Sequence, residues 1–215
     1  AAYWGVVQPL LLSSPRTAEV DRIAFVRTQL AELAEPTPKA ALTAAFADAE
    51  LPLTDCCDPS YLALRLTFDL PAVPPEGLGM VTYQQVDNLM VMVNGSIVLS
   101  QGRMAFGSQT FDGQRPHLIR LPSGLVRAGS NEIVFITVRQ GFPYTDLVPP
   151  VLGPWEQVSP WAAQRMWQFT DRVLISGWTT FLLGLFAALL LWRAQDRHFA
   201  FWLMVLCWSW SGLAA

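Results

Sequence analysis

Charged residues are scarce in this chain of 215 residues: they make up 14% of it, against 52% hydrophobic residues. Soluble domains carry about 25% charged residues, so part of the chain must be unusually apolar. Cations are not in excess, because 14 Lys and Arg face 17 Asp and Glu, and the net charge is −3. Nucleic-acid binding needs a basic face, so we expect no nucleic-acid partner. Three cysteines make no disulfide framework, and 16 prolines with 14 glycines exclude a helical bundle throughout.

Charge is absent altogether from residues 173–192, which read VLISGWTTFLLGLFAALLLW. As a helix this segment extends about 30 Å, the thickness of the hydrocarbon core of a bilayer. A second uncharged segment, residues 199–215, is near the shortest length that spans a bilayer. We therefore expect an α-helical transmembrane hairpin with a cytoplasmic loop at 193–198, where Arg193 and Arg197 lie. The end of the chain would truncate its second helix. A helix buried in a large globular core is the alternative for 173–192.

Strand periodicity begins at residues 61–68 (YLALRLTF), where Leu and Phe alternate with other residues as in a half-buried strand. Further short strands are predicted at residues 80–83, 88–93, 96–100, 117–121 and 132–138. Asn94-Gly95 favours a type I′ hairpin turn between two of them. Residues 132–138 are apolar on both faces, which is typical of a central strand. This pattern predicts an all-β antiparallel sandwich.

The residues before the strands show a different period. Val20, Ile23, Val26, Leu30 and Leu33 recur at helical spacing. They predict a short amphipathic helix over residues 17–34, which Pro36 ends. The alanine-rich residues 40–50 either extend this helix or form a linker.

Two stretches carry a resemblance to a known fold. DNLMVMVNGSIVLSQGRM and PHLIRLPSGLVRAGSNEIVFITV resemble the galactose-binding-like jelly roll over residues 87–138. Asn131, in the turn Gly129-Ser130-Asn131, is expected to cap the backbone that enters the last strand. The order of jelly roll, Leu-Gly-Pro exit and apolar helix resembles bacterial 7TM-DISM receptors over residues 51–215. Those receptors combine an extracytoplasmic domain, seven membrane helices and diverse intracellular signalling modules.

That resemblance implies an extracytoplasmic sensor domain, a homodimer, and an output module beyond residue 215. The module would be a histidine kinase or a diguanylate cyclase, and at most two of the seven membrane helices lie in this chain. Ser159 and Pro160 predict a helix start, and nothing up to Trp192 breaks the helix. The predicted organisation is an N-terminal segment at 1–50 and a jelly-roll sensor domain at 51–158. A stalk and first membrane helix follow at 159–192, and then the loop and the second helix.

The cysteines and histidines suggest little chemistry. Cys56 and Cys57 are adjacent, and they either form a redox-sensitive or intermolecular disulfide or are simply small residues at the start of a strand. Cys207 is predicted to pack against lipid or another helix. His117 heads a strand without neighbouring metal-ligand spacing, and His198 lies at the predicted membrane edge. We assign neither histidine a catalytic or metal-binding role.

Acidic residues and exposed loops are the remaining candidates for a site. Asp87, Asp112, Asp146 and Glu156 are scattered, and nothing in the sequence pairs two of them as a glycosidase requires. Arg103 and Tyr144 in loops, and Tyr83 as an aromatic platform, are considered for a ligand but not assigned to one. No phosphate loop, nucleophile elbow or zinc motif occurs. We predict no catalytic, cofactor or metal residue, and we expect that this chain is not itself an enzyme.

These features predict the sensor and membrane-anchor part of a bacterial receptor in the inner membrane, with the sandwich in the periplasm or outside. Ligand binding or dimer rearrangement would shift the continuous helix and so bias the output. The expected partners are the lipid bilayer, a small molecule or glycan, and a second copy. The alternatives are a membrane-tethered carbohydrate-binding module and a subunit of a cell-envelope membrane complex.

Overall fold

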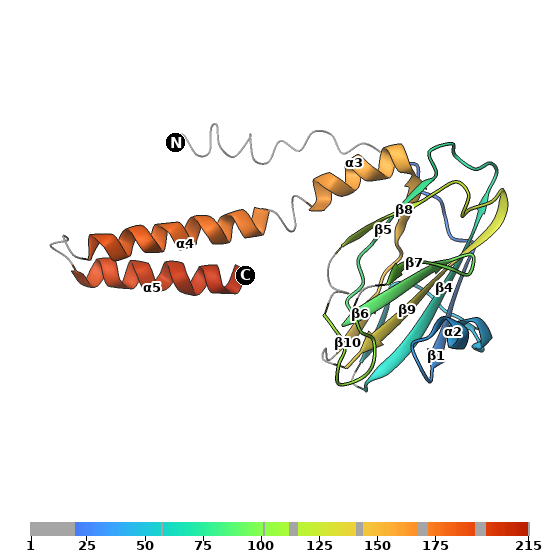
Figure 1. Ribbon diagram of the computed structural model, residues 1–215, viewed down its shortest axis with the longest axis horizontal. Coiled ribbons are helices and arrows are strands. Elements are labelled where there is room, and N and C mark those ends of the chain that lie inside the picture. Colours follow the sequence, from blue (N-terminus) through green and yellow to red (C-terminus); the bar gives the residue numbers. More distant parts are fainter. Residues whose placement is uncertain are drawn as a thin grey trace. The chain divides into compact units, whose positions relative to one another are not determined.

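The computed structural model describes residues 20–56, 58–100, 102–111, 116–140, 144–166, 172–191 and 197–214. The chain divides into two compact units, residues 1–162 and residues 163–215. The first unit is mostly antiparallel β-sheet, and the second is helical (Figure 1). The coarse prediction of a β-rich domain followed by helices is therefore confirmed.

The largest sheet has six strands in the order β2-β1-β4-β9-β6-β7, and every neighbouring pair is antiparallel. Its strands are β1 (Arg27–Leu33), β2 (Ala47–Asp48), β4 (Ser60–Leu70), β6 (Asn88–Val93), β7 (Ser96–Ser100) and β9 (Gly129–Arg139). The eleven-residue strands β4 and β9 lie side by side at its centre. This places β9 as the central strand that its two apolar faces predict.

Two smaller antiparallel sheets complete the first unit. One has the order β11-β5-β8, and the other pairs β10 with β3. Their strands are β3 (Leu53–Cys56), β5 (Leu78–Thr82), β8 (His117–Leu121), β10 (Tyr144–Leu147) and β11 (Val151–Pro154). The sequence analysis did not predict β3, β10 and β11, each of four residues, nor the two-residue β2 of the large sheet.

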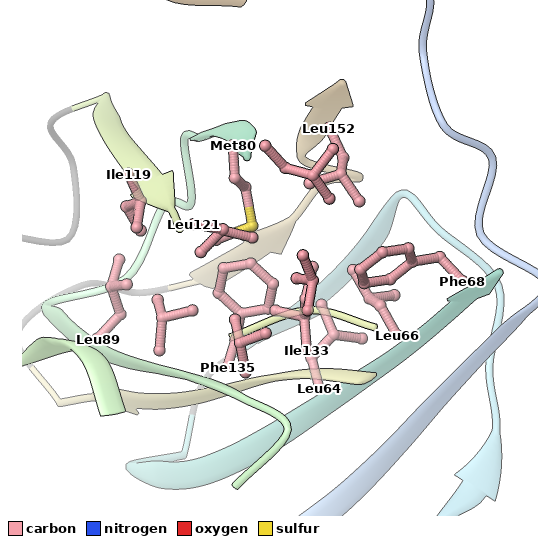
Figure 2. Close-up of a cluster of buried hydrophobic side chains, with 14 of the residues drawn as sticks. Leu64, Leu66, Phe68, Met80, Leu89, Ile119, Leu121, Ile133, Phe135 and Leu152 are labelled. Carbon is pink, nitrogen blue, oxygen red and sulfur yellow. The ribbon is translucent and has the colours of Figure 1, made fainter. Parts of the chain in front are cut away.

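The core lies between the large sheet and the three-stranded sheet (Figure 2). Leu64, Leu66 and Phe68 alternate along β4 and point into it, as the period of two requires. Other strands contribute Met80, Leu89, Ile119, Leu121, Ile133, Phe135 and Leu152. Since side chains of two facing sheets fill one apolar layer, the unit is consistent with a β-sandwich.

The outer face of the large sheet has a second, smaller apolar cluster that includes Tyr61, Met92, Val134 and Ile136. Helix α2 (Pro38–Thr43) packs there through Ala41, which is 1% exposed. Thr37 caps this helix, because its Oγ1 accepts a hydrogen bond from the Ala40 N–H at 3.2 Å. Both faces of the central strands are thus covered, so β4 is more deeply buried than the half-buried strand predicted from its alternation.

The predicted helix over residues 17–34 is wrong. Its second half is strand β1, which pairs antiparallel with residues 61–67 of β4, and residues 20–26 are not helical; residues 17–19 lie outside the described residues. The edge of β4 offers backbone hydrogen bonds along all seven residues of β1, and this pairing outweighs the weak helical preference of the segment. Because β1 and β2 belong to the main sheet, the predicted domain boundary at residue 51 falls inside the sandwich.

The Asn94-Gly95 turn matches its prediction. Asn94 has φ 48° and Gly95 has φ 82°, so both central residues take the left-handed conformation of a type I′ turn. Strands β6 and β7 flank it with the predicted bounds. The other predicted strands are all found, with ends that differ by a few residues.

Helix α3 (Trp155–Met166) begins earlier than predicted, and Pro160 lies inside it. The predicted start at Ser159 and Pro160 is therefore wrong. The helix follows β11 at once, and the Trp155 N–H donates to the Gly77 carbonyl at 3.2 Å. Residues 167–171 lie outside the described residues, so the predicted continuity of this helix with the next one stays a prediction.

The second unit contains helices α4 (Arg172–Leu190) and α5 (Arg197–Ala214), which lie against each other (Figure 1). Within the described residues, no helix combines the length and the apolarity needed to cross a membrane. This finding corrects the prediction of two transmembrane spans. The helices also differ from the predicted spans in their bounds, because α4 ends at Leu190 rather than Trp192 and α5 begins at the charged Arg197 rather than Phe199.

Candidate ligand-binding site

A loop that follows β7 forms the candidate site, and its described part is residues 102–111. Arg103 and Thr110 close it, because the Thr110 N–H donates to the Arg103 carbonyl at 3.0 Å and the Arg103 N–H donates to Thr110 Oγ1 at 3.1 Å. Asn88 at the start of β6 donates from Nδ2 to Thr110 Oγ1 at 2.8 Å and to the Arg103 carbonyl at 3.3 Å. The loop is therefore fixed to the large sheet.

The tip of this loop carries an aromatic shelf, which we define as Phe106 stacked on Tyr61. The two rings are nearly parallel, with centroids 4.0 Å apart and an interplanar angle of 10°. The Phe106 N–H also donates to the Tyr61 hydroxyl oxygen at 2.9 Å. Tyr61 is buried, whereas Phe106 is 41% exposed. The shelf thus presents an aromatic surface on a loop that its hydrogen bonds hold in place.

Hydrogen bonds of Gln109, Gln140 and the buried Asp87 fix the loop to the end of β9. Gln140 accepts a hydrogen bond from the Gly107 N–H at its Oε1, at 2.6 Å. Asp87, which is fully buried, accepts at Oδ2 from the Gln140 N–H at 2.6 Å and from Gln109 Nε2 at 3.3 Å. Asp87 therefore orders the loop and the end of β9.

A second polar cluster lies where β5 and β10 end. Gln84 donates from Nε2 to Thr82 Oγ1 at 3.0 Å and to the Val148 carbonyl at 2.9 Å. Its Oε1 accepts from the Val148 N–H at 2.8 Å. Gln84 is buried, and its amide pairs with both the N–H and the carbonyl of Val148 in the segment between β10 and β11, so these backbone groups have hydrogen-bond partners.

The structure brings some of the predicted candidates together. Asp87 and Arg103 both serve the loop, but the Arg103 guanidinium donates from Nε to the Ser108 carbonyl at 2.9 Å and so stabilises the loop itself. Tyr83 follows β5 and is exposed. Asp146 in β10 accepts from Thr54 Oγ1 at 2.7 Å. Tyr144 is the first residue of β10, and its side chain is not among those described.

The remaining candidates lie apart from the shelf. Glu156 is exposed on α3, His117 begins β8, and His198 is exposed in the first turn of α5. Cys207 is buried, and its Cβ would lie 3.2 Å from a Cβ built at Gly184, so it packs between α4 and α5 as predicted.

Three of the sequence candidates cannot be placed in full. Cys56 ends β3 rather than starting a strand, and its side chain is not described. Cys57 and Asp112 lie outside the described residues. Whether the two adjacent cysteines form a disulfide therefore stays a prediction.

Sequence reasoning missed Phe106, Gln109 and Gln140. Gln140 meets Gly107 from 33 residues away, and no local pattern reveals such a contact. Phe106 did carry a weak signal, since it is a large apolar residue in a segment of glycines and polar residues.

The shelf offers an aromatic face, neutral amides and hydroxyls. Within the described part of the chain, no three His, Cys, Asp or Glu residues gather as metal ligands. No family model matches the chain, and no curated protein matches it. The resemblance to 7TM-DISM receptors therefore stays a prediction.

Proposed function

We propose that this chain is the sensor and membrane-anchor part of a bacterial signalling receptor. In this proposal the sandwich lies outside the cytoplasm and recognises a ligand, and the α4–α5 hairpin is embedded in lipid. The observation that carries it is the distribution of side-chain size in the hairpin.

The α4–α5 hairpin buries small side chains and exposes large apolar ones, which is the opposite of the sandwich. Its buried residues are small: Gly177, Gly184 and Ala187 on α4, and Ala200 and Cys207 on α5. The large apolar side chains are exposed instead. On α4 they are Leu174, Ile175, Trp178, Phe181, Leu182, Leu183, Leu185, Phe186, Leu189 and Leu190, and on α5 Phe199, Phe201, Trp202, Val205, Leu206, Trp208 and Trp210.

This distribution favours a lipid environment. Apolar area in water costs about 25 cal/mol per Å², and patches this large are unusual on proteins that stay in water. Small residues at a close helix–helix contact and large apolar residues outside are typical of helices in lipid. The first residue of each helix is an arginine, Arg172 in α4 and Arg197 in α5. The rest of each helix contains no Asp, Glu, Lys or Arg. Lipid contact of this kind does not require either helix to cross the bilayer alone.

The aromatic shelf supports the sensor part of the proposal. A sugar ring has one apolar face and a rim of hydroxyls, and Phe106 with the amides of Gln109 and Gln140 would suit both. A neutral glycan or a similar small molecule is therefore the ligand class that we propose. The same shelf would also serve the alternative of a membrane-tethered carbohydrate-binding module. The homodimer and the kinase or cyclase output rest on the resemblance alone.

Lysine substitutions distinguish lipid from water around the hairpin. Leu182, which is 60% exposed, is replaced by lysine, and the control is Ile97→Lys on β7 of the sandwich, where Ile97 is 52% exposed. A lysine in hydrocarbon costs about 2.5–3.5 kcal/mol, which corresponds to a partition about 100-fold weaker. The assay is flotation of the full chain with vesicles of phosphatidylethanolamine and phosphatidylglycerol. We expect Leu182→Lys to weaken flotation strongly and Ile97→Lys to leave it unchanged; equal flotation of both variants would contradict lipid burial.

A further inference from the structure

We propose that helix α3 is a separable output element, which is held on the sandwich by a latch and can detach while the β-sheets stay folded. The inference rests on the proposed sensor function, because it names the element through which a change in the sandwich would leave it. Three features of the described residues carry the inference: the seat of α3, the latch over it, and the small apolar cluster through which α3 packs on the sheet.

The seat is a pair of glycines. Gly79 of β5 and Gly153 of β11 are direct partners in the antiparallel register. Val158 of α3 packs on both: a Cβ built at Gly79 would lie 2.7 Å from Val158 Cβ, and one at Gly153 would lie 3.2 Å from Val158 Cγ2. Both distances are too short for an ordinary Cβ contact. Glycine is therefore required at these two positions for α3 to approach the sheet so closely.

The latch is the extended segment Val20–Ile23, which crosses this seat. The Asp21 N–H donates to Gln157 Oε1 at 2.8 Å, and Gln157 Nε2 donates back to Asp21 Oδ2 at 3.1 Å. The Arg22 guanidinium lies 6.0 Å from the centre of the Trp161 ring. The Ile23 N–H donates to the Leu152 carbonyl at 2.9 Å and so fixes the segment to β11. The latch thus joins α3 to the strand that carries half of its seat.

The attachment of α3 is small beside the main core. Of its described side chains, Val158 and Ala162 are buried, and they share with Val81 a cluster that is separate from the main core. Trp161 packs on this cluster while partly exposed, and the Arg120 guanidinium of β8 lies 5.2 Å from the centre of the Trp155 ring. The latch contacts are exposed to water, where hydrogen bonds and cation–π contacts are individually weak. Elements with few buried apolar contacts open locally at a lower free energy than the whole domain. We therefore expect α3 to open first.

The seat is also connected to the polar cluster around Gln84. Strand β5 carries Gly79 near one end and Thr82 at the other, where Gln84 binds it. Gln84 also holds Val148, which lies three residues before β11 and its Gly153. A ligand that moves the Gln84 amide would act on both strands that form the seat.

Hydrogen exchange of the full chain in detergent micelles tests this inference. In Gly79→Ala the new methyl group meets Val158 and must displace α3, so we expect exchange of the α3 amides to rise by about tenfold or more while β4 and β9 stay as protected as in the wild type. Gln157→Ala removes both hydrogen bonds of the latch, and we expect a smaller rise of about fivefold in α3 alone. The control is Gly124→Ala, because no described heavy atom lies within 4 Å of a Cβ at Gly124.

Two results would overturn the inference. One is exchange of α3 that rises only together with that of β4 and β9, because α3 would then open only when the whole domain unfolds. The other is unchanged α3 exchange in Gly79→Ala. If Gly79→Ala fails to fold, Gln157→Ala decides by the same readout. The outcome is independent of the vesicle assay, so an α3 that opens locally in a chain that does not float would remove the membrane proposal and keep the latch.

Discussion

Replacing Asn131 should cost more stability than replacing any exposed polar residue of the sandwich, because every hydrogen-bonding position of its side chain is used. Asn131 is 2% exposed. Its Oδ1 accepts from the Arg127 N–H and from Asn94 Nδ2, both at 2.9 Å. Its Nδ2 donates to the carbonyls of Arg127 at 2.7 Å and Gly129 at 2.9 Å. The amide thereby ties the turn before β9 to the turn between β6 and β7.

The magnitude follows from this count. A hydrogen bond contributes about 0.5–1.5 kcal/mol net, so the loss of these bonds in Asn131→Ala amounts to about 2–6 kcal/mol. We expect about 3 kcal/mol, because the freed groups belong to turns that water can reach. The assay is urea unfolding of the full chain in mild detergent. Ser130→Ala, at the exposed neighbouring position, should stay within about 0.5 kcal/mol of the wild type. A loss below about 1 kcal/mol in Asn131→Ala would refute the reasoning.

The variant Asn131→Asp tests the orientation of the amide. The aspartate keeps the shape but places a second oxygen against the carbonyls of Arg127 and Gly129, which disfavours the charged form and raises the pKa of the new carboxyl in the folded state. A group with a raised folded-state pKa contributes most below its unfolded-state pKa, about 3.9 for Asp, and loses stability as the pH rises. The deficit of Asn131→Asp should thus be larger at pH 7 than at pH 3. An equal deficit at both pH values would contradict the orientation.

Two further predictions concern the shelf and the edge of the large sheet. Phe106→Ala should abolish the binding of neutral oligosaccharides on a glycan array and leave the urea midpoint near that of the wild type, since the Phe106 ring is half exposed; retained binding would exclude the shelf as the ligand site. The hydrogen bond from Arg27, at 2.7 Å, lowers the pKa of Asp48, so its contribution is present at neutral pH and is lost as the pH falls through the folded-state pKa. Arg27→Ala should raise the pKa of Asp48 in an NMR titration, and an unchanged pKa would contradict this pairing.

The strands that could be predicted are those whose side chains alternate over enough residues. Residues 61–68 and 132–138 show the period and form the centre of the sheet. The Asn94-Gly95 turn and the capping role of Asn131 follow from local backbone preferences that tertiary contacts do not alter. Strand β1 was predicted as a helix because its leucines recur at helical spacing, and its partner β4, which makes it a strand, lies far away in the sequence.

The candidate site could be predicted only in part. Sequence reasoning singled out Asp87 and Arg103, and both lie at the base of the loop. Their roles were not foreseeable, because Asp87 serves the backbone of Gln140 and Arg103 serves its own loop. The exposed ring of Phe106 depends on Tyr61 beneath it, and that contact exists only once the sheet has formed.

The two units of the chain use apolar side chains in opposite ways. In the sandwich the largest buried side chains include Phe68 and Phe135, which both project from the large sheet into the core. In the hairpin, Gly184 and Ala187 are buried while Trp178 and its large neighbours are exposed. A sandwich of the first kind is complete in water, because its own strands cover its apolar surface. A hairpin of the second kind needs another apolar surface to cover its large side chains. Whether that surface is lipid decides whether the chain is a membrane-bound sensor.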